Sequence, residues 1–565
     1  MSRLIKGFDT DKLSFWLGGA IGLIIFIIIF GFGTLDVRYT DWLLLKSDLS
    51  QHYLGWEFFR KSEWLFPIGL TNSLAYPDTS SVMFTDSIPL ISIPLKLFNY
   101  ILPDNFQFFG WYTLIMFFLQ GAIGSLIIKK TTHNLYYAFF SSIIFVISPI
   151  FIWRCFTHTS LTSHFIILLC LLIFICYKNG IEKYPTRMIT IWSLLAIIST
   201  TIHFYFTPIV FLFITAYIIN DFISNKIAIR QLLCLIIPCI ASFLSLYLCG
   251  GFSSDVTPPN TANSGGLGYF SANINALLNP IYDYNCEKSC STFLHKPELF
   301  KLANSGQYEG FAFMGVGMML CIVFVLLFFL LNKNYRKSVI NIIKQRKSTT
   351  LILLFTSFVF FILSLSPTIT FGNKTLANIQ LPSIFLKVWS IFKSTGRFVW
   401  PVYYIILIST IYFIFLAHEQ SPKKFAAIFA LFCVFIQIVD LMPWTISESR
   451  RKIATLYYPS DYYNRINRIM NNKKHLEFCN DFDFANNNEL LFLAHNNNLT
   501  VNVFYFSRAL PAYSDIKVNK SLENLNLDSE DNIYIFSKKY FDTNTDRFQQ
   551  LPHLIVNDRV IVYNN

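Results

Sequence analysis

The chain has 565 residues, of which 54% are hydrophobic and only 14% are charged. Soluble proteins of this length usually carry about a quarter charged residues, so the composition excludes an ordinary soluble enzyme. The net charge of +12 does not indicate nucleic-acid binding, because the excess cations lie in short loops between apolar runs and not in one basic region.

Apolar runs of membrane-spanning length recur from Ser14 to Met442 and predict an all-α polytopic membrane protein with about 11 transmembrane helices. The first run has no small-residue cleavage site, so we interpret it as a retained span and not as a signal peptide. The predicted spans are Ser14–Gly33, Phe106–Ile128, Leu135–Trp153, Leu161–Tyr177, Met188–Ile202, Phe204–Phe222, Gln231–Leu248, Gly310–Leu331, Thr349–Leu365, Val399–Ala417 and Phe425–Met442.

The segment Ser87–Leu102 is apolar but short, and it contains Pro89, Pro94 and Lys96. If this segment does not cross the membrane, eighteen lysine and arginine residues fall on the side of the N-terminus. Cytoplasmic loops carry an excess of these residues, so the charge favours a membrane-edge helix at this segment. The same count predicts a cytoplasmic N-terminus and an extracytoplasmic C-terminus.

The outer side then holds two long loops, 34–105 and 250–309, and the end of the chain. After Pro443 the composition becomes rich in Asn, Asp, Lys and Tyr, which predicts a transmembrane domain at 1–443 and a small soluble extracytoplasmic α/β domain at 444–565. In that domain we expect a helix at Ser460–Asn471 and strands at Leu490–Ala494, Val501–Tyr505, Ile533–Phe536 and Val560–Tyr563.

Two cysteines, Cys286 and Cys290, lie in the polar loop 250–309. A local disulfide and two free thiols both remain open for this pair.

The first outer loop contains an acidic residue at the start of a segment with helical spacing. Asp48 follows Ser47, and either side chain would cap the predicted helix. The alternative is that the Asp48 carboxylate faces a cavity in which an acceptor hydroxyl loses its proton, and a capping residue can also be catalytic. His52 lies one turn later, where it would either tune Asp48 by a hydrogen bond or be an ordinary interfacial side chain.

Asp86 precedes the predicted membrane-edge helix and is expected to cap it, which would bring Asp86 near Asp48.

A second group of polar residues flanks the outer ends of the third, fourth and fifth spans. Ionisable groups at this depth tend to line polar cavities. The histidines also raise the question of a metal site, but their positions in separate loops do not form the HxxxH pattern of a single helix. The residues are Arg154, His158, His164 and His203.

Later in the chain, Glu309 opens the eighth span and is expected either in the headgroup layer or in the same cavity. Lys393 and Arg397 lie at the outer end of the tenth span. They are either snorkelling cations of an aromatic belt or ligands of a lipid phosphate, which Arg397 would hold by two parallel hydrogen bonds. The sequence has no Walker loop, GxGxxG, HExxH, GxSxG or paired CxxC motif, which argues against an ATP-driven pump or a soluble nucleotide-sugar site.

Eight short stretches between Ser47 and Tyr404 carry a resemblance to a known superfamily. They are SDLSQHYLGWEFFR, YPDTSSVMFTDSIPLISIPLKLF, FQFFGWYTLIMFFLQG, HTSLTSHF, HFYFTP, GYFSANINALLNP, YEGFAFMGVG and STGRFVWPVYY. In this order they resemble the GT-C superfamily of integral-membrane glycosyltransferases, and more closely a bacterial branch of uncharacterised membrane proteins within it.

The resemblance implies a GT-C-like enzyme of the bacterial inner membrane. Such an enzyme takes a sugar from a polyprenyl-phosphate-linked donor and passes it to a cell-surface glycan or glycolipid on the outer face. Membrane lipids are then its surroundings, and nucleic acid is not a partner. A transporter or flippase of a lipid-linked glycan is the alternative from another class.

The resemblance also suggests roles for individual residues. Asp48 would be the catalytic base with His52 assisting. Many relatives have two nearly adjacent acidic residues here, whereas Leu49 and Ser50 follow Asp48 in this chain, so no cofactor is certain and a divalent cation stays an open alternative. The candidate substrate-binding residues are Asp86, Arg154, His158, His164, His203, Glu309, Lys393 and Arg397.

Overall fold

The computed structural model describes residues 9–44, 48–176, 180–224, 229–253, 255, 266–283, 285, 287–420, 425–452, 460–480, 483–507, 525, 529–556 and 558–564. Cys286 lies outside these residues, and so does Ser47, the alternative cap of the predicted helix at Asp48.

Nine helices of the described chain are long and apolar enough to cross a membrane, and the number rises to 11 if each of two bent helix pairs forms one span. The pair α5 (Leu135–Val146) and α6 (Pro149–Thr157) bends by 40°, and the pair α12 (Val316–Leu331) and α13 (Lys333–Gln345) bends by 105°. The prediction of a polytopic, mostly helical membrane protein is therefore confirmed. The nine helices are α1 (Thr10–Phe30), α4 (Phe109–Thr132), α7 (Phe165–Cys176, with the preceding turn from Thr159), α9 (Pro185–Ile202), α10 (Phe206–Ser224), α11 (Ile229–Leu248), α14 (Lys347–Leu365), α16 (Val399–Gln420) and α17 (Phe425–Lys452).

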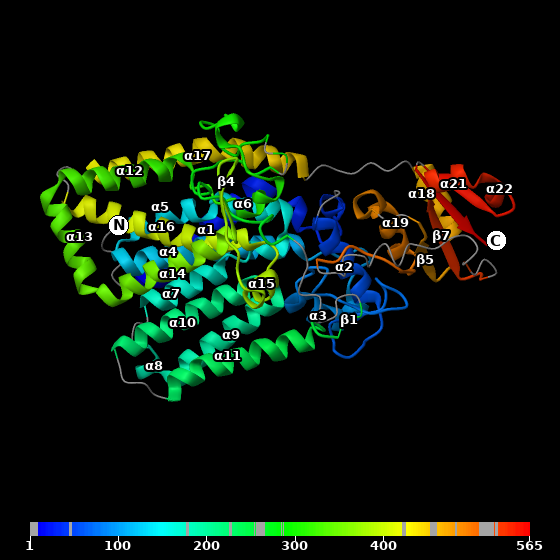
Figure 1. Cartoon of the computed structure of the whole chain (residues 1–565), viewed down its shortest axis with the longest axis horizontal. Helices are drawn as coiled ribbons and strands as arrows, with labels where there is room; N and C mark the ends of the chain where they lie inside the picture. The colour runs from blue at the N-terminus through cyan, green and yellow to red at the C-terminus, as the bar shows by residue number, and fades with distance from the viewer. Residues whose placement is uncertain are drawn as a thin grey trace.

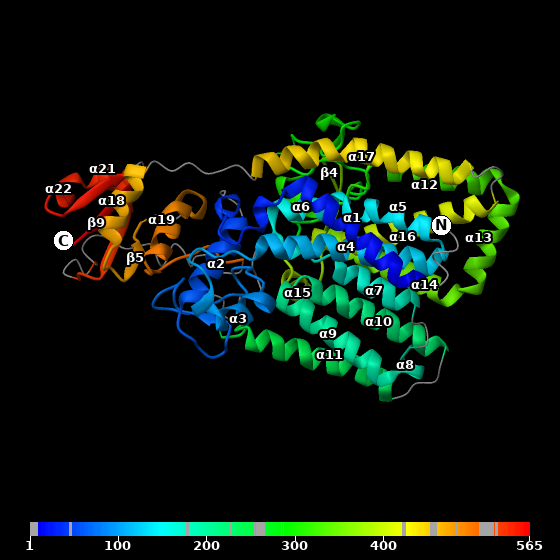
Figure 2. The same ribbon diagram turned by 180° about the vertical axis from the view of Figure 1, so that it is seen from behind.

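The two ends of the helix bundle carry different parts of the chain (Figure 1). The start of α1, the short helix α8 (Gly180–Lys183) and the basic helix α13 lie at one end. The helices α2 (Asp48–Lys61) and α3 (Pro89–Leu97) lie at the other end, and the C-terminal domain lies beyond them, as the view from behind also shows (Figure 2). The segments that the charge count assigns to opposite sides of the membrane are thus at opposite ends of the bundle.

The apolar segment before α4 does not form a membrane span. Its helix α3 has nine residues, and at 1.5 Å per residue it is about 14 Å long, whereas the hydrocarbon core is about 30 Å thick. Its Lys96 folds back onto the end of α2, where its ammonium donates to the Ser62 hydroxyl and the Glu63 carbonyl at 3.0 Å each. The helix is therefore attached to the end of α2, as expected for a segment that stays at one side of the membrane.

The C-terminal region forms a small α/β unit. Its five-stranded sheet has the order β6-β5-β7-β9-β8, parallel between β6, β5 and β7 and antiparallel between β7, β9 and β8. The predicted strand Leu490–Ala494 is wrong, because these residues lie inside the helix α19 (Phe484–Asn496). The other elements are α18 (Ser460–Met470), β5 (His475–Phe478), β6 (Thr500–Val501), β7 (Asn532–Ser537), α21 (Lys538–Thr543), α22 (Thr545–Phe548), β8 (His553–Val556) and β9 (Arg559–Tyr563).

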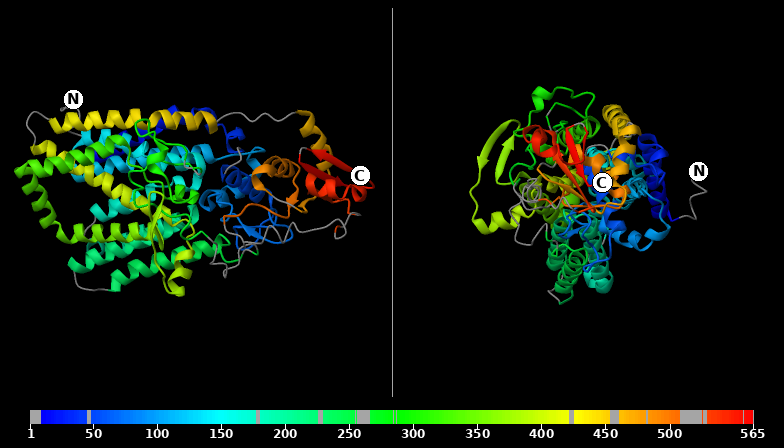
Figure 3. Two further views of the ribbon diagram at one scale, coloured as in Figure 1. Left: turned by 45° about the horizontal axis from the view of Figure 1, so that its top comes forward. Right: turned by 90° about the vertical axis from the view of Figure 1, so that its right-hand side faces the viewer.

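A β-hairpin stands at the side of the bundle (Figure 3) and braces a loop on which the site depends. It consists of β3 (Thr368–Phe371) and β4 (Lys374–Asn378) and precedes α15 (Ser383–Ser390). The Gln307 side chain, in the 3-10 helix η6 (Ser305–Gly310), donates to the Thr370 hydroxyl at 2.6 Å. This bond fixes η6, whose next-to-last residue is Glu309.

Candidate active site

Charged and histidine side chains from six separate segments meet at the end of the bundle that faces the C-terminal domain. The segments are α2, the turn before α3, the end of α6, the turn between α9 and α10, η6, and the 3-10 helix η7 (Thr395–Phe398) that leads into α16. The side chains are Asp48, His52, Asp86, Arg154, His158, His203, Glu309 and Arg397.

Asp48 is the first residue of α2, where a negative charge is favoured by the helix dipole. The residue is exposed, yet burial in the surrounding protein is the largest cause that raises its pKa to about 6, followed by the nearby carboxylates of Glu309 and Asp86. Two arginines oppose this rise. Solvent therefore reaches this residue although protein surrounds its carboxylate. Such a group is ionised at pH 7 and still basic enough to accept a proton.

Glu309 ties two arginines together inside the protein. The Arg397 guanidinium donates to both Glu309 oxygens, at 2.8 and 3.0 Å, and Arg154 donates to Oε2 at 2.7 Å. Burial alone would raise the pKa of Glu309, but the two arginines outweigh it and hold this pKa far below its usual range. Two guanidinium groups and one carboxylate leave a net positive charge in a nearly inaccessible place.

The close approach of η7 to η6, which brings Arg397 to Glu309, requires glycine at position 396. A Cβ atom on Gly396 would lie 2.6 Å from the Cα and N atoms of Gly310, so the backbones of η6 and η7 touch directly. Only glycine permits this approach.

Asp86 does not cap the helix that follows it, so that expectation is wrong. The N-cap residue of α3 is Ile88, which makes no side-chain capping bond. Asp86 has a φ of +54° and turns its carboxylate inward. Its Oδ2 lies 3.4 Å from Nε2 of His158, and its Oδ1 lies 3.6 Å from Nε2 of His203.

Of the two alternatives for His52, the hydrogen bond to Asp48 is not formed. Both its ring nitrogens are buried and lack a hydrogen-bond partner among the described residues. The ring instead packs at 65° against that of His158, with a centroid distance of 4.4 Å. Burial, reinforced by His158, lowers the pKa of His52, so its imidazole is neutral at pH 7.

Burial also lowers the pKa of His158 and of His203, so these rings are neutral as well. His164 lies apart from them. Its Nδ1 is 2.9 Å from the Tyr404 hydroxyl, and its ring lies 4.5 Å from that of Trp400. His164 therefore belongs to the packing between α7 and α16.

The two candidate phosphate ligands differ in their pairing. Arg397 uses its Nε and one terminal nitrogen on Glu309 and lies over the Tyr205 ring at 4.3 Å. Lys393 is half-buried, lies 5.7 Å from the Phe270 ring centroid, and pairs with no carboxylate in the described part of the chain. Burial is the main cause that lowers the pKa of Lys393, followed by the charge of Arg397.

The C-terminal domain reaches this cluster through a contact that no motif in the sequence predicts. The Gln51 side chain in α2 donates to the Tyr505 carbonyl at 3.2 Å, across 454 residues of chain. Burial raises the pKa of Tyr505, and Asp48, Asp86 and Glu309 raise it further, so the phenol lies within electrostatic reach of all three carboxylates. A contact between segments so far apart leaves no local signal in a single sequence.

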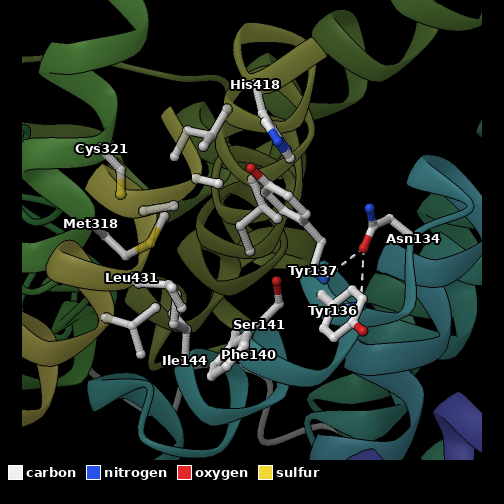
Figure 4. A pocket seen from close by; sticks show the side chains of 15 residues that line it. Asn134, Tyr136, Tyr137, Phe140, Ser141, Ile144, Met318, Cys321, His418 and Leu431 are labelled. Atoms are coloured by element: carbon white, nitrogen blue, oxygen red, sulfur yellow. Dashed lines mark hydrogen bonds between the residues drawn. The ribbon is translucent and has the colours of Figure 1, made fainter. Parts of the chain in front are cut away.

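An apolar cavity of about 240 Å³ lies elsewhere, between α5, α12, α16 and α17 (Figure 4). Phe140, Ile144 and Met318 line it, and stacked rings of Tyr137 and His418 supply polar atoms at one side. It shares no residue with the polar cluster, and its walls suit hydrocarbon and not a charged substrate.

Comparison with known proteins places the chain in a family. The model of the domain of unknown function DUF6311 matches residues 19–442, and that of the DUF6311 C-terminal domain matches residues 465–563. The chain belongs to the DUF6311 family. No curated protein matches this DUF6311 chain.

Two solved structures are similar to this DUF6311 protein in architecture. The apo crystal structure of the Archaeoglobus fulgidus oligosaccharyltransferase has 10% identity and a TM-score of 0.43, covering 92% of this chain and 70% of that one. The structure of the same enzyme tethered by a disulfide bond to an acceptor peptide containing the NVT sequon has 11% identity and a TM-score of 0.41, covering 92% and 68%.

Proposed function

We propose that this DUF6311 protein is a membrane glycosyltransferase of the GT-C type. It transfers a sugar from a polyprenyl-phosphate-linked donor to a glycan or glycolipid acceptor. The reaction takes place on the outer face of a bacterial inner membrane, with the N-terminus cytoplasmic and the domain 444–565 outside. The observation that carries the proposal is a solvent-facing carboxylate, Asp48, placed beside buried arginines with excess positive charge at one end of a bundle of membrane spans.

In the proposed reaction, Asp48 accepts the proton of an acceptor hydroxyl. The hydroxyl oxygen then attacks the anomeric carbon of the donor sugar, and the bond from that carbon to the lipid phosphate oxygen breaks. The bonding pair leaves with the phosphate, so one glycosidic bond forms, one phosphoester bond breaks, and the proton ends on Asp48. A pKa of about 6 suits this role, because the group is mostly ionised at pH 7 but retains basicity.

The departing polyprenyl phosphate is an anion that needs a cationic partner. Lys393 and Arg397 supply it, Lys393 as an ammonium without a carboxylate partner in the described chain and Arg397 as part of the positively charged group around Glu309. Charge stabilisation by fixed cations in a site of low dielectric lowers the barrier to bond cleavage. Glu309 acts by orienting the arginines, and we assign it no contact with the acceptor.

The bilayer geometry supports a lipid-linked donor. The cluster lies where candidate membrane spans end, so the phosphate of a membrane lipid can reach it while the polyprenyl chain stays in the hydrocarbon.

The proposal is tested on purified full-length protein in detergent, incubated with polyprenyl-phosphate-linked sugars and candidate glycan acceptors. We expect release of polyprenyl phosphate that depends on the acceptor. A transporter or flippase would release none, because it moves the intact lipid-linked glycan and needs a sealed membrane. Absence of release across the panel of donors and acceptors, together with movement of the lipid-linked glycan in sealed vesicles, would overturn the proposal.

A further inference from the structure

Three side chains of the cluster form a group that the proposed transfer reaction does not use. His52 lies in the second turn of α2, Asp86 in the turn before α3, and His158 at the C-terminal end of α6. One ligand atom from each lies within 4.8 Å of the other two. All three residues are buried, with exposures of 0%, 7% and 6%.

We infer that His52, Asp86 and His158 bind a divalent transition-metal ion of the zinc class. Two imidazoles and one carboxylate are donors that Zn²⁺ and its neighbours prefer, whereas Mg²⁺ and Ca²⁺ prefer oxygen alone.

The first support is the state of His52. Neither ring nitrogen has a hydrogen-bond partner among the described residues, although both atoms are buried. An unsatisfied buried polar group is costly, and such groups in native proteins call for an explanation such as a bound ion. A metal ion between His52 and its two neighbours satisfies one of these nitrogens.

The second support is the pairing of His158. Its Nδ1 lies 3.1 Å from the Ser160 hydroxyl oxygen, which can accept a hydrogen bond from the Nδ1–H group. Nε2 then keeps its lone pair free, which is the arrangement that orients metal-binding histidines. Nε2 and Asp86 Oδ2 are 3.4 Å apart, and two ligands about 2.1 Å from a tetrahedral ion lie about 3.4 Å from each other.

The third support is that the neighbouring histidine is excluded as a ligand. Nδ1 of His203 accepts the backbone N–H of Tyr205 at 3.2 Å. The neutral ring therefore carries its proton on Nε2, the atom that faces Asp86, and has no lone pair to offer there. His203 is a positioning residue that holds the Asp86 carboxylate in place.

The inferred site has three protein ligands, so it leaves a coordination position for an exchangeable ligand, unlike closed structural zinc sites. The turn that presents Asp86 is strained, because both Asp86 and the β-branched Ile88 have positive φ values, +54° and +56°. Strain of this kind persists where the surrounding structure holds it in place, and it concentrates at functional sites.

The test measures metal binding directly and needs no substrate, so its outcome is independent of the proposed transfer reaction. Full-length protein in detergent is treated with a chelator, dialysed and titrated with Zn²⁺, Co²⁺, Mg²⁺ and Ca²⁺. We expect one equivalent of Zn²⁺ per chain by elemental analysis, and a visible d–d absorption from Co²⁺ typical of a four-coordinate site. Mg²⁺ and Ca²⁺ should not compete with Zn²⁺ at equal concentration.

Variants decide which residues bind the ion. His52→Ala and His158→Ala should each weaken Zn²⁺ binding at least 100-fold and remove the Co²⁺ band, since loss of an orienting neighbour alone costs 10- to 100-fold. His553→Gln, in the C-terminal domain, is the matched control and should bind like the wild type. Elution volume and unfolding temperature establish that each variant is folded. If the His52→Ala protein is not folded, Asp86→Asn is used in its place.

The inference is overturned if the wild-type protein binds no Zn²⁺ and shows no Co²⁺ band, or if it binds only Mg²⁺ or Ca²⁺. It is also overturned if a folded His52→Ala protein binds Zn²⁺ as tightly as the His553→Gln control.

Discussion

At the scale of single residues, Asp48 combines two properties that seldom occur together. It is exposed, and it is surrounded by enough protein and negative charge for its pKa to rise to about 6. Arg154 and Arg397 limit the rise, because both lie close enough to lower this pKa. Ordinary surface carboxylates ionise near pH 4, so Asp48 is a better proton acceptor than other exposed acids.

The pKa of Asp48 predicts the pH dependence of the proposed transfer. A base must be ionised to accept a proton, and the ionised fraction falls as pH drops through about 6. Between pH 7 and pH 5 we expect the rate to fall about tenfold, measured as acceptor-dependent release of polyprenyl phosphate under limiting substrate. A cation bound at His52, Asp86 and His158 would favour the ionised form of Asp48 and move this fall in rate to lower pH. The dependence of the rate on pH is therefore measured on metal-stripped protein and again after Zn²⁺ is added. A flat profile from pH 5 to 7 in the stripped protein, with measurable activity, would contradict the role of Asp48.

Residue types and their order in the chain were enough to identify most members of the cluster. An acid at a helix start, histidines at span ends and cations at a span entrance are each unusual in an apolar chain, and the structure brings Asp48, His158 and Arg397 together. The contacts that these side chains make with one another were not predictable from the sequence. Asp86 was expected as a cap because it precedes a helix, but its positive φ, which sequence patterns do not reveal, turns its carboxylate toward the histidines.

At the scale of elements, α2 contributes one face to the polar cluster and another to the contact with the C-terminal domain. Asp48 and His52, one turn apart, belong to the polar cluster. Ser50 and Glu57 contact the C-terminal domain: the Asn488 amide donates to the Ser50 hydroxyl at 3.0 Å, and Glu57 meets α19. The helix that presents the candidate base is thus held by the domain that covers it.

The contact between α2 and α19 depends on one buried histidine. Nε2 of His495 lies 2.6 Å from Oε2 of Glu57, whose other oxygen lies 3.0 Å from Nε of Arg60. Burial lowers the pKa of His495, although Glu57 opposes this shift, so the ring is neutral at pH 7. All three side chains are nearly inaccessible, so a lost partner is not replaced by water.

Replacing His495 should therefore loosen α2. His495→Leu removes the partner of a buried carboxylate oxygen, at a cost of about 1–3 kcal/mol. We expect faster amide hydrogen exchange across residues 48–61 with little change in the transmembrane helices. His553→Leu is the control, because the hydrogen-bond partner of His553 is the Leu551 carbonyl in its own domain. Equal exchange in the two variants would show that this contact does not hold α2.

Long elements were predictable from the sequence and short ones were not. Spans follow from continuous apolar length, and nine of the predicted spans are single helices long enough to cross a membrane. The predicted spans Leu135–Trp153 and Gly310–Leu331 instead fall on the two bent helix pairs. The strand predicted at Leu490–Ala494 failed because a five-residue apolar run fits a buried strand and a helix equally well, and here it lies inside a 13-residue helix. Pro443 does not end its helix either, since α17 continues to Lys452. The boundary at 443 between the two predicted domains stays a prediction.

At the scale of the whole molecule, the bundle separates basic loops from the polar cluster. The N-terminal end of α1 and α13 lie at one end, and α2, α3 and the C-terminal domain lie at the other (Figure 1). The polar cluster includes Asp48 and His52 of α2. Topology by charge predicts the same separation, because the positive residues that orient a membrane protein are far from those that build its site. The contact between residues near 500 and residues near 50 could not be predicted from a single sequence. An example is the hydrogen bond from the Gln51 side chain to the Tyr505 carbonyl.

Asp48 is the proposed base of the glycosyl transfer, and the loss of its carboxylate tests this role. Asp48→Asn keeps the size and polarity of the side chain but cannot accept the proton, and Asp104→Asn changes an exposed acid of the same loop. Acceptor-dependent release of polyprenyl phosphate is measured in detergent for the wild type and both variants, with matched expression and unfolding temperature. We predict that Asp48→Asn lowers the rate at least 100-fold, the scale of a lost general base, while Asp104→Asn stays within about twofold of wild type. Full activity in a folded Asp48→Asn protein would contradict the role of Asp48 as the base.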